Sequence, residues 1–113
     1  MKEMMIKQEY LTFIKEGRKK LEIRVGYKNI KKIKSGDSIM MKSASETQSI
    51  SVKDVRYYKS FEDMLKYEKL ELIAPGSTEE ETLRILKEIY PPEKEELGVI
   101  VIELEPVESF IEH

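Results

Sequence analysis

The 113-residue chain contains no cysteine, and its one histidine, His113, is the last residue. The absence of cysteine excludes disulfides, thiolate zinc sites and cysteine nucleophiles. A single terminal histidine argues against a histidine-based triad or metal centre. The sequence also has no glycine-rich phosphate loop, which disfavours nucleotide hydrolysis. No apolar run approaches the ~20 residues that span a bilayer, and no signal-peptide pattern opens the chain. We therefore expect a cytoplasmic protein with no metal, cofactor or membrane partner.

The charges are divided unevenly along the chain. Residues 1–34 hold 11 Lys/Arg and 4 Asp/Glu, a net charge of +7, whereas the remainder holds 9 and 18, a net charge of −9. The total of −2 does not indicate a protein that binds bulk DNA. A local basic surface could still guide one anionic ligand. The alternative is that the lysines only decorate a solvated surface.

The length predicts a single domain, residues 1–113, without internal repeats. A hydrophobic content of 40% is enough to fill one modest core. Pro106 ends the last apolar segment, so we expect residues 107–113 to form a loose tail. The sequence leaves the oligomeric state open.

The most informative stretch is residues 17–25, where a glycine and a basic turn lead into alternating residues. Because side chains of a strand alternate between its faces, the apolar residues at 21, 23 and 25 can enter a core. The other face then carries Glu22 and Arg24 side by side, with Lys19 arriving from the turn. Such a cluster is either a solvated strand face or the wall of a binding groove.

Helical periodicity predicts two main helices. Apolar residues at 10, 11, 13 and 14 predict a helix over 8–16, with Gly17 as its C-cap. The second helix spans 78–90, with Ser77 or Thr78 as its cap and Pro91-Pro92 as its end. Its residue Glu81 lies one turn before Ile85 and is expected at the edge of the buried stripe. A shorter helix over 61–67 follows Ser60, and residues 68–76 are read as a loop or a brief helical turn.

Three further strands are predicted, over 38–42, 49–58 and 99–104. Residues 26–34 are read as a basic connection, Ser35-Gly36-Asp37 as a turn, and 43–48 as a hairpin loop. A bulge near residues 53–54 would turn both Val55 and Tyr57 toward the core. The consecutive β-branched residues at 99–102 indicate a strand that is covered on both faces at first.

The spacing Gly17-x-Lys19-x-x-Glu22-x-Arg24 resembles the signature at the start of ASCH domains, small relatives of the PUA fold. The Gly36-Asp37 turn, the strand-to-helix corner at 57–61 and the strand after Gly98 extend the resemblance over nearly the whole chain. The resemblance implies an α+β fold: a small, curved, mostly antiparallel β-barrel flanked by helices, with a cleft beside the signature strand. We expect five or six strands in a closed or half-closed barrel.

ASCH domains are regarded mainly as RNA-binding or RNA-associated modules, so the resemblance implies an RNA, nucleoside or nucleotide ligand. Arg24 would contact a phosphate or a base edge, and Glu22 would accept from an exocyclic amine or hold Arg24 in place. Alternatively, these two residues only pair with each other, which is worth about 0–1 kcal/mol at an exposed site. A pure protein-interaction domain is a third reading. The predicted ligand-binding residues are Arg18, Lys19, Glu22, Arg24, Tyr10 and Tyr90.

One branch of the superfamily consists of amidohydrolases that remove acetyl from 4-acetylcytidine. The branch uses a lysine in an Arg-Lys turn, a threonine three residues on, and a glutamate in the later helix. Lys19 matches the lysine, Glu81 falls at the glutamate, and Glu22 occupies the position of the threonine. A glutamate cannot replace a hydroxyl nucleophile, although it could activate water as a general base. The alternative function is thus a small amidohydrolase of acylated nucleosides with Lys19, Glu22 and Glu81 converging on one pocket, and whether the chain is an enzyme stays open.

Overall fold

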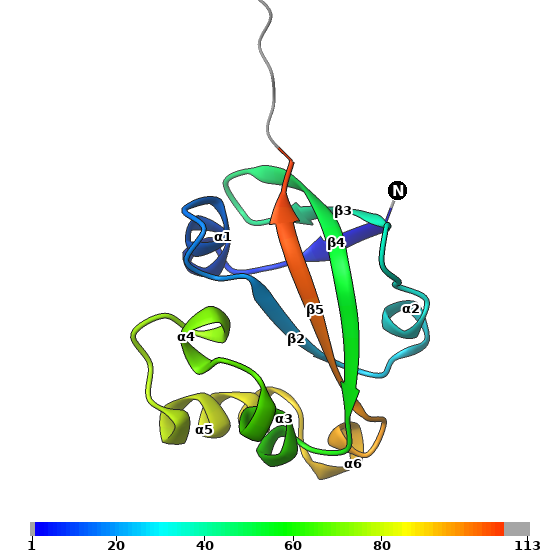
Figure 1. The fold of residues 1–113 in the computed structure, drawn as a ribbon, viewed down its shortest axis with the longest axis vertical. Helices are drawn as coiled ribbons and strands as arrows, with labels where there is room; N and C mark the ends of the chain where they lie inside the picture. The colour runs from blue at the N-terminus through cyan, green and yellow to red at the C-terminus, as the bar shows by residue number, and fades with distance from the viewer. Residues whose placement is uncertain (1, 108–113) are drawn as a thin grey trace, which may run out of the picture.

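The computed structural model describes residues 2–107, in which five strands form one sheet in the order β1-β3-β4-β5-β2. The strands are β1 (Lys2–Met5), β2 (Leu21–Val25), β3 (Ser38–Lys42), β4 (Thr47–Tyr58) and β5 (Val99–Pro106). The helices are α1 (Gln8–Lys15), α2 (Lys28–Lys31), α3 (Phe61–Tyr67), α4 (Leu70–Ile73), α5 (Glu79–Ile89) and α6 (Pro92–Glu95). The sheet curls into a half-barrel with helices around it, which confirms the predicted PUA-like α+β fold (Figure 1).

The sheet is mostly antiparallel, as predicted. The β1–β3 pair is parallel, and the β3–β4, β4–β5 and β5–β2 pairs are antiparallel. The register between β4 and β5 shifts between Val52 and Asp54, which confirms the predicted bulge. Val55 then packs against the core as expected, but Tyr57 is 61% exposed. The inward placement of Tyr57 was wrong: its register partner Ile100 is buried, but Tyr57 itself is exposed, and the next residue, Tyr58, packs against the apolar residues of α3, α4 and α5.

The apolar residues form two clusters, and β5 contributes to both. Ile100, Ile102 and Leu104 belong to the cluster that includes α1 and α2 residues. Val99 and Val101 belong to the cluster that includes α3, α4 and α5 residues. The prediction that this strand is covered on both faces is therefore confirmed. β2 follows its predicted alternation, since Leu21, Ile23 and Val25 all join the second cluster.

Local signals fix the ends of the two main helices. Gly17 has a φ of 78°, the left-handed conformation that glycine adopts without strain after a helix. The hydroxyl of Thr78 accepts from the backbone N–H of Glu81, and the Glu81 carboxylate accepts from the backbone N–H of Thr78. This reciprocal capping box holds the first turn of α5.

Three short elements were not predicted: β1, α2 within the expected basic connection, and α6 directly after α5. α4 is the brief helical turn expected within 68–76. The loose tail expected over 107–113 lies outside the described residues, apart from Val107.

Candidate ligand-binding cavity

A cavity of about 220 Å³ opens where the curled sheet leaves its two edge strands unpaired with each other. Its walls come from the end of β1 and the start of α1, from the turn before β2 and β2 itself, and from α4 and α5. We call it the seam cavity, because it lies between the edge strands β1 and β2. Arg24 on β2 donates from Nη2 to the carbonyl oxygen of Met5 on β1, at 2.8 Å. A side chain thus joins edges that no backbone ladder connects.

Lys19 is buried at the base of this cavity, with only 4% of the residue exposed. Its Nζ donates to the carbonyl oxygens of Leu21 at 2.6 Å and Ile73 at 2.8 Å, and lies 3.2 Å from Oε1 of Glu22. Three acceptors match the three N–H groups of an ammonium, which is why a charged lysine is tolerated here. Lys19 therefore fastens the end of α4 to the start of β2.

Glu22 lies between two cations. Its Oε2 accepts from Nε of Arg24 at 2.7 Å, and Nη2 of the same guanidinium lies 2.6 Å away. Burial alone would raise the pKa of Glu22, but the charges and hydrogen bonds of Lys19 and Arg24 outweigh it and hold that pKa below its ordinary value. The carboxylate is thus ionised at neutral pH. Buried Lys19 and Glu22 together with the partly exposed Arg24 carry a net charge of +1 beside the cavity.

Two tyrosines complete the walls of the cavity. The ring of Tyr90 packs at 6.1 Å and 34° on Phe61, a fully buried residue, so the core fixes its position. Tyr10 lies on α1, and its ring centroid is 5.7 Å from Nζ of Lys19. Burial raises the pKa of both phenols, so both hydroxyls stay protonated at neutral pH. The rest of the wall is mainly aliphatic, with side chains from α4 and α5.

Thr82 was not predicted as a site residue. It is 4% exposed and lines the cavity, and its Oγ1 has no hydrogen-bond partner among the described residues. The sequence does contain a signal for it, because Thr82 lies one turn before Leu86, which is also buried. A polar residue in register with the buried stripe of an amphipathic helix is a candidate for a site.

The structure brings together five of the seven predicted site residues: Tyr10, Lys19, Glu22, Arg24 and Tyr90 all line the seam cavity. Arg18 does not line it and stacks on Phe13, with its guanidinium 4.7 Å from the ring centroid. Glu81 also lies outside the lining and is exposed. The expectation that it converges with Lys19 and Glu22 was wrong, because its side chain is used in the capping box of α5.

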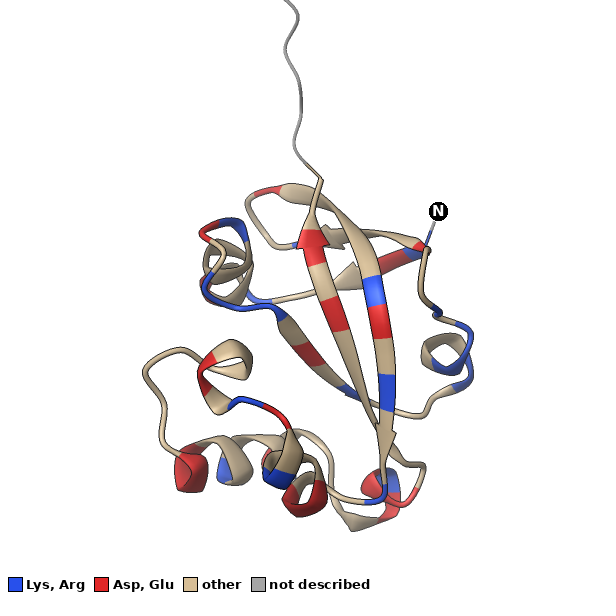
Figure 2. Cartoon of the chain, viewed as in Figure 1, with Lys and Arg blue, Asp and Glu red and all other residues tan. Residues whose placement is uncertain are grey.

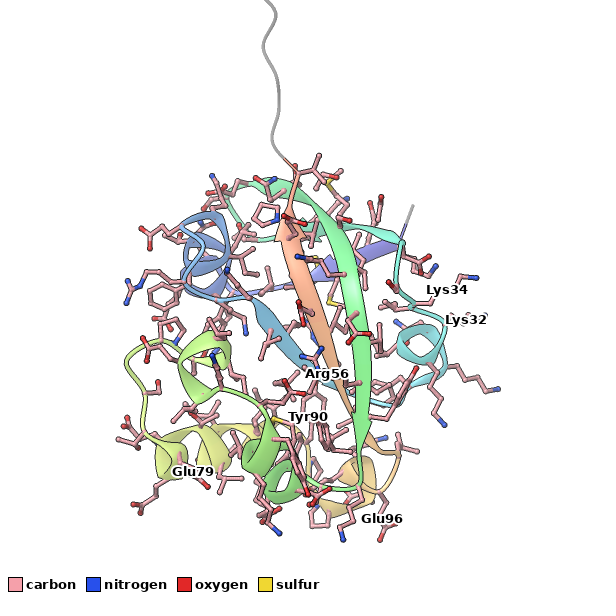
Figure 3. All side chains as sticks on the ribbon, in the orientation of Figure 1. Lys32, Lys34, Arg56, Glu79, Tyr90 and Glu96 are labelled. Carbon is pink, nitrogen blue, oxygen red and sulfur yellow. The ribbon has the colours of Figure 1, made fainter. Side chains whose placement is uncertain are left out.

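The basic residues of the first 34 positions do not form one surface. In Figure 2 they are divided between the connection from α1 to β2 and the region of α2. Figure 3 shows Lys32 and Lys34 projecting outward beside α2, away from Tyr90. Only Lys7, Lys19 and Arg24 among them line the cavity. The charge that can act on a bound ligand is therefore small and local.

Among residues 2–107, no three His, Cys, Asp or Glu side chains come close enough to hold a metal ion. None of the helices there is both long and apolar enough to cross a membrane.

Residues 4–108 match the sequence profile of the ASCH domain. The chain belongs to the ASCH domain family. This ASCH domain resembles the crystal structure of the hypothetical protein PH0355, with 37% identity and a TM-score of 0.86 over 95% of this chain and 100% of that one. It also resembles the solution structure of protein PF0455 from Pyrococcus furiosus, with 37% identity and a TM-score of 0.79 over 96% and 98% of the two chains.

A more distant structure has the same fold. Protein EF3133 from Enterococcus faecalis V583 is 16% identical, with a TM-score of 0.63 over 90% of this ASCH domain and 72% of that chain. No curated protein matches this ASCH domain in sequence. Family membership supports a PUA-like domain of a generally RNA-associated kind, and the substrate or ligand has to be argued from the cavity.

Proposed function

We propose that this ASCH domain binds single-stranded RNA by taking one unpaired nucleotide into the seam cavity. The observation that carries the proposal is the combination of a tyrosine-walled cavity with a buried cationic cluster at its base. Sequence-specific RNA recognition generally uses unstacked bases, which stack on aromatic side chains and bond through their edges. Tyr10 and Tyr90 supply the aromatic surface, and Arg24 supplies donors.

The volume of the cavity supports a ligand of nucleotide size. Pockets for drug-sized molecules occupy roughly 300–1,000 Å³, so about 220 Å³ suits one base with part of its sugar. A duplex cannot enter such a space. Its bases would have to leave the stack, which costs least in a strand that is already single.

The charges of the cavity support an anionic or oxygen-rich ligand. Lys19 and Arg24 outnumber Glu22, and Arg24 is still 21% exposed in its side chain. A partly exposed guanidinium at the cavity can donate to a phosphate or a carbonyl oxygen. The residue pair is thus more than the mutual surface ion pair that the sequence allowed, because Arg24 also bonds to Met5 across the seam.

The test is a titration of short single-stranded RNAs against the wild type and an Arg24→Ala variant. We expect affinity at low salt, and a loss of about tenfold or more in the variant, because a hydrogen bond to a charged group is worth about 1.5–3 kcal/mol. Arg18→Ala is the matched control, since it removes the same charge outside the cavity. Thermal melting of each variant checks that it is folded. Equal affinity of Arg24→Ala and wild type, or no RNA binding at low salt, contradicts the proposal.

Hydrolysis of an acylated nucleoside is the second candidate, and the shared cavity of Lys19 and Glu22 is the observation in its favour. The surroundings of Lys19 and Glu22 suit ligand binding better than they suit catalysis. Glu22 is paired with two cations and its pKa is lowered, which makes it a weak general base. All three N–H groups of Lys19 already face acceptors. Incubation with 4-acetylcytidine separates the candidates: binding without acetate release supports the first, and release that Glu22→Gln abolishes supports the second.

A further inference from the structure

The unpartnered hydroxyl of Thr82 is the least explained polar group in the cavity. A buried hydroxyl without a partner costs about 1–3 kcal/mol, so proteins rarely keep one unless something else satisfies it. In a helix, threonine can bond back to the carbonyl of the preceding turn, yet Oγ1 of Thr82 makes no such bond. Thr82 lines the cavity, so a rotation of its side chain would turn this hydroxyl toward a group that enters.

The sequence suggested that Glu22 would accept a hydrogen bond from an exocyclic amine of the ligand. In the structure both of its carboxylate oxygens already have partners. Its Oε1 faces the ammonium of Lys19 and its Oε2 takes two nitrogens of Arg24. Within residues 2–107, the hydrogen bonds of Arg24 use Nε and Nη2, and none uses Nη1. The polar groups left for a ligand include a guanidinium donor of Arg24 and the hydroxyl of Thr82, which can both donate and accept, beside the hydroxyls of Tyr10, Ser77 and Tyr90 and the ammonium of Lys7.

We propose that the seam cavity selects a base whose edge carries a carbonyl oxygen beside a ring N–H, with Arg24 donating to the carbonyl and Thr82 bonding to the ring nitrogen. This inference rests on the proposed RNA-binding function and names the ligand class within it. Uracil and guanine have such an edge. Cytosine and adenine present an amino group in place of the carbonyl oxygen.

The net positive charge beside the cavity determines which of the two base edges binds more tightly. An exocyclic amine that points toward Arg24 would set donor against donor beside a net positive charge, and one hydrogen bond of each group would be lost. A carbonyl oxygen at the same place accepts from the guanidinium. The hydroxyl of Thr82 can rotate to accept from the ring N–H of uracil or to donate to the bare ring nitrogen of cytosine. Arg24 therefore sets the preference, and Thr82 adds affinity and orientation.

The experiment compares short oligo(U) with oligo(C), two pyrimidine strands of equal size, charge and backbone. With the wild-type protein we expect oligo(U) to bind about tenfold more tightly, the equivalent of about 1.4 kcal/mol. Equal affinity for the two strands overturns this inference and leaves the proposed function intact. Absence of binding to either strand overturns both.

A variant series tests the part assigned to Thr82. Thr82→Val keeps the shape and removes the hydroxyl, and we expect it to weaken oligo(U) binding about three- to tenfold. Thr82→Ser restores a hydroxyl and should recover most of the affinity. The control is Thr47→Val, at an exposed threonine on β4 that does not line the cavity.

Stability separates a ligand contact from a structural role of the same hydroxyl. Replacing an unpartnered buried hydroxyl by a methyl group removes a desolvation cost, so the melting temperature of free Thr82→Val should equal or exceed that of the wild type. Weaker oligo(U) binding with undiminished stability supports the inference. Unchanged oligo(U) binding overturns it.

Discussion

At the scale of single residues, the ammonium of Lys19 joins two parts of the molecule that are distant in the sequence, the start of β2 and the end of α4. It bonds to the carbonyl oxygens of Leu21 and Ile73 and lies beside the carboxylate of Glu22. A buried lysine is expensive unless each of its protons has an acceptor. The residue that the sequence marks as a ligand or catalytic group is thus also a structural group that positions β2 against α4.

Lys19→Met should therefore lower the free energy of unfolding by roughly 3 kcal/mol, at the lower end of the range for breaking a buried pair because Glu22 keeps Arg24. The variant leaves two carbonyl oxygens without their donor but preserves the apolar stem. Urea unfolding measures the change, with Lys20→Met at the exposed neighbouring position as the control. A stability equal to that of the wild type would mean that the ammonium reaches solvent.

The ionisation of Glu22 makes a second prediction. Its folded-state pKa lies below the ordinary value of 4.5, so the stabilisation that it supplies is present above about pH 4.5 and is lost as the pH falls through the folded-state pKa. We expect Glu22→Gln to be less stable than the wild type at pH 7 and the difference to shrink toward pH 3. Other carboxylates titrate in both proteins and cancel in the difference. A difference that stays constant or grows in acid contradicts the assignment of an ionised, paired Glu22.

At the scale of elements, neighbouring residues of α5 have different roles. Some stabilise the helix itself, and others line the seam cavity. Thr78 and Glu81 form the capping box, whereas Thr82 faces the cavity. Successive helical residues are about 100° apart, so a shift of one position moves a side chain from the cap to the cavity wall. The helix thus uses Glu81, which the sequence placed in the site, for capping, and Thr82 for the cavity wall.

Two variants test whether helix capping and ligand binding are carried by different residues of α5. Thr78→Ala should lower the free energy of unfolding by about 1 kcal/mol, the usual loss for an N-cap threonine, and should leave RNA affinity unchanged. Glu81→Gln should likewise leave RNA affinity unchanged, because the carboxylate lies outside the cavity lining. A marked loss of RNA affinity in Glu81→Gln would show instead that Glu81 contributes to the binding site.

Elements with local signals could be predicted, and elements held by distant contacts could not. The helix over 61–67 begins after the Ser60 cap, and the β4 bulge follows from a change of phase in the apolar residues. β1 has four residues and pairs in parallel with β3, far along the chain, so nothing local marks it. α6 did carry a signal that was read only as a stop, because the Pro91-Pro92 pair that follows α5 also supplies the N-cap and the first residue of α6.

One part of the site could be predicted from the sequence: the charged residues that strand alternation places on one face of β2. The alternation in β2 placed Glu22 and Arg24 on one face, and the structure confirms that they share the cavity with Lys19. The burial of Lys19 could not be derived, because its acceptor at Ile73 comes from a segment with no sequence pattern linking it to β2. Thr82 was missed because Glu81, one residue earlier, fitted the chemistry of the resembled enzymes.

At the scale of the whole molecule, the uneven charge distribution does not produce one basic face. The chain is acidic overall, and the basic residues of its first 34 positions are divided between the connection from α1 to β2 and the region of α2 (Figure 2). Another charged group, Arg56, is held by Glu68, Glu103 and Asp54 and has little left to offer a polyanion. Over residues 2–107 the molecule therefore presents small, separate basic regions, one of them at the seam cavity, rather than a continuous electrostatic track for nucleic acid.

Because the positive charge at the cavity is small and local, RNA affinity should fall only moderately as the salt concentration rises. For single strands the slope of log affinity against log salt is about −0.7 for each phosphate neutralised. With one to three phosphates near the cavity, raising the salt from 50 to 200 mM should weaken binding by roughly three- to twentyfold. A titration series at several salt concentrations gives the slope. A steep slope, equivalent to five or more phosphates, would instead indicate a broad basic surface such as the α2 lysines.

The most direct test of the account is to map where single-stranded RNA touches the protein. Two-dimensional amide NMR of the labelled domain, recorded while short oligo(U) is added, reports every backbone position at once. The seam-cavity account predicts that the largest shift changes fall in residues 19–24 and 82–90, with residues near Arg56 unchanged. Changes concentrated at residues 28–34 around α2, or spread evenly over the surface, would contradict the claim that one nucleotide enters the cavity.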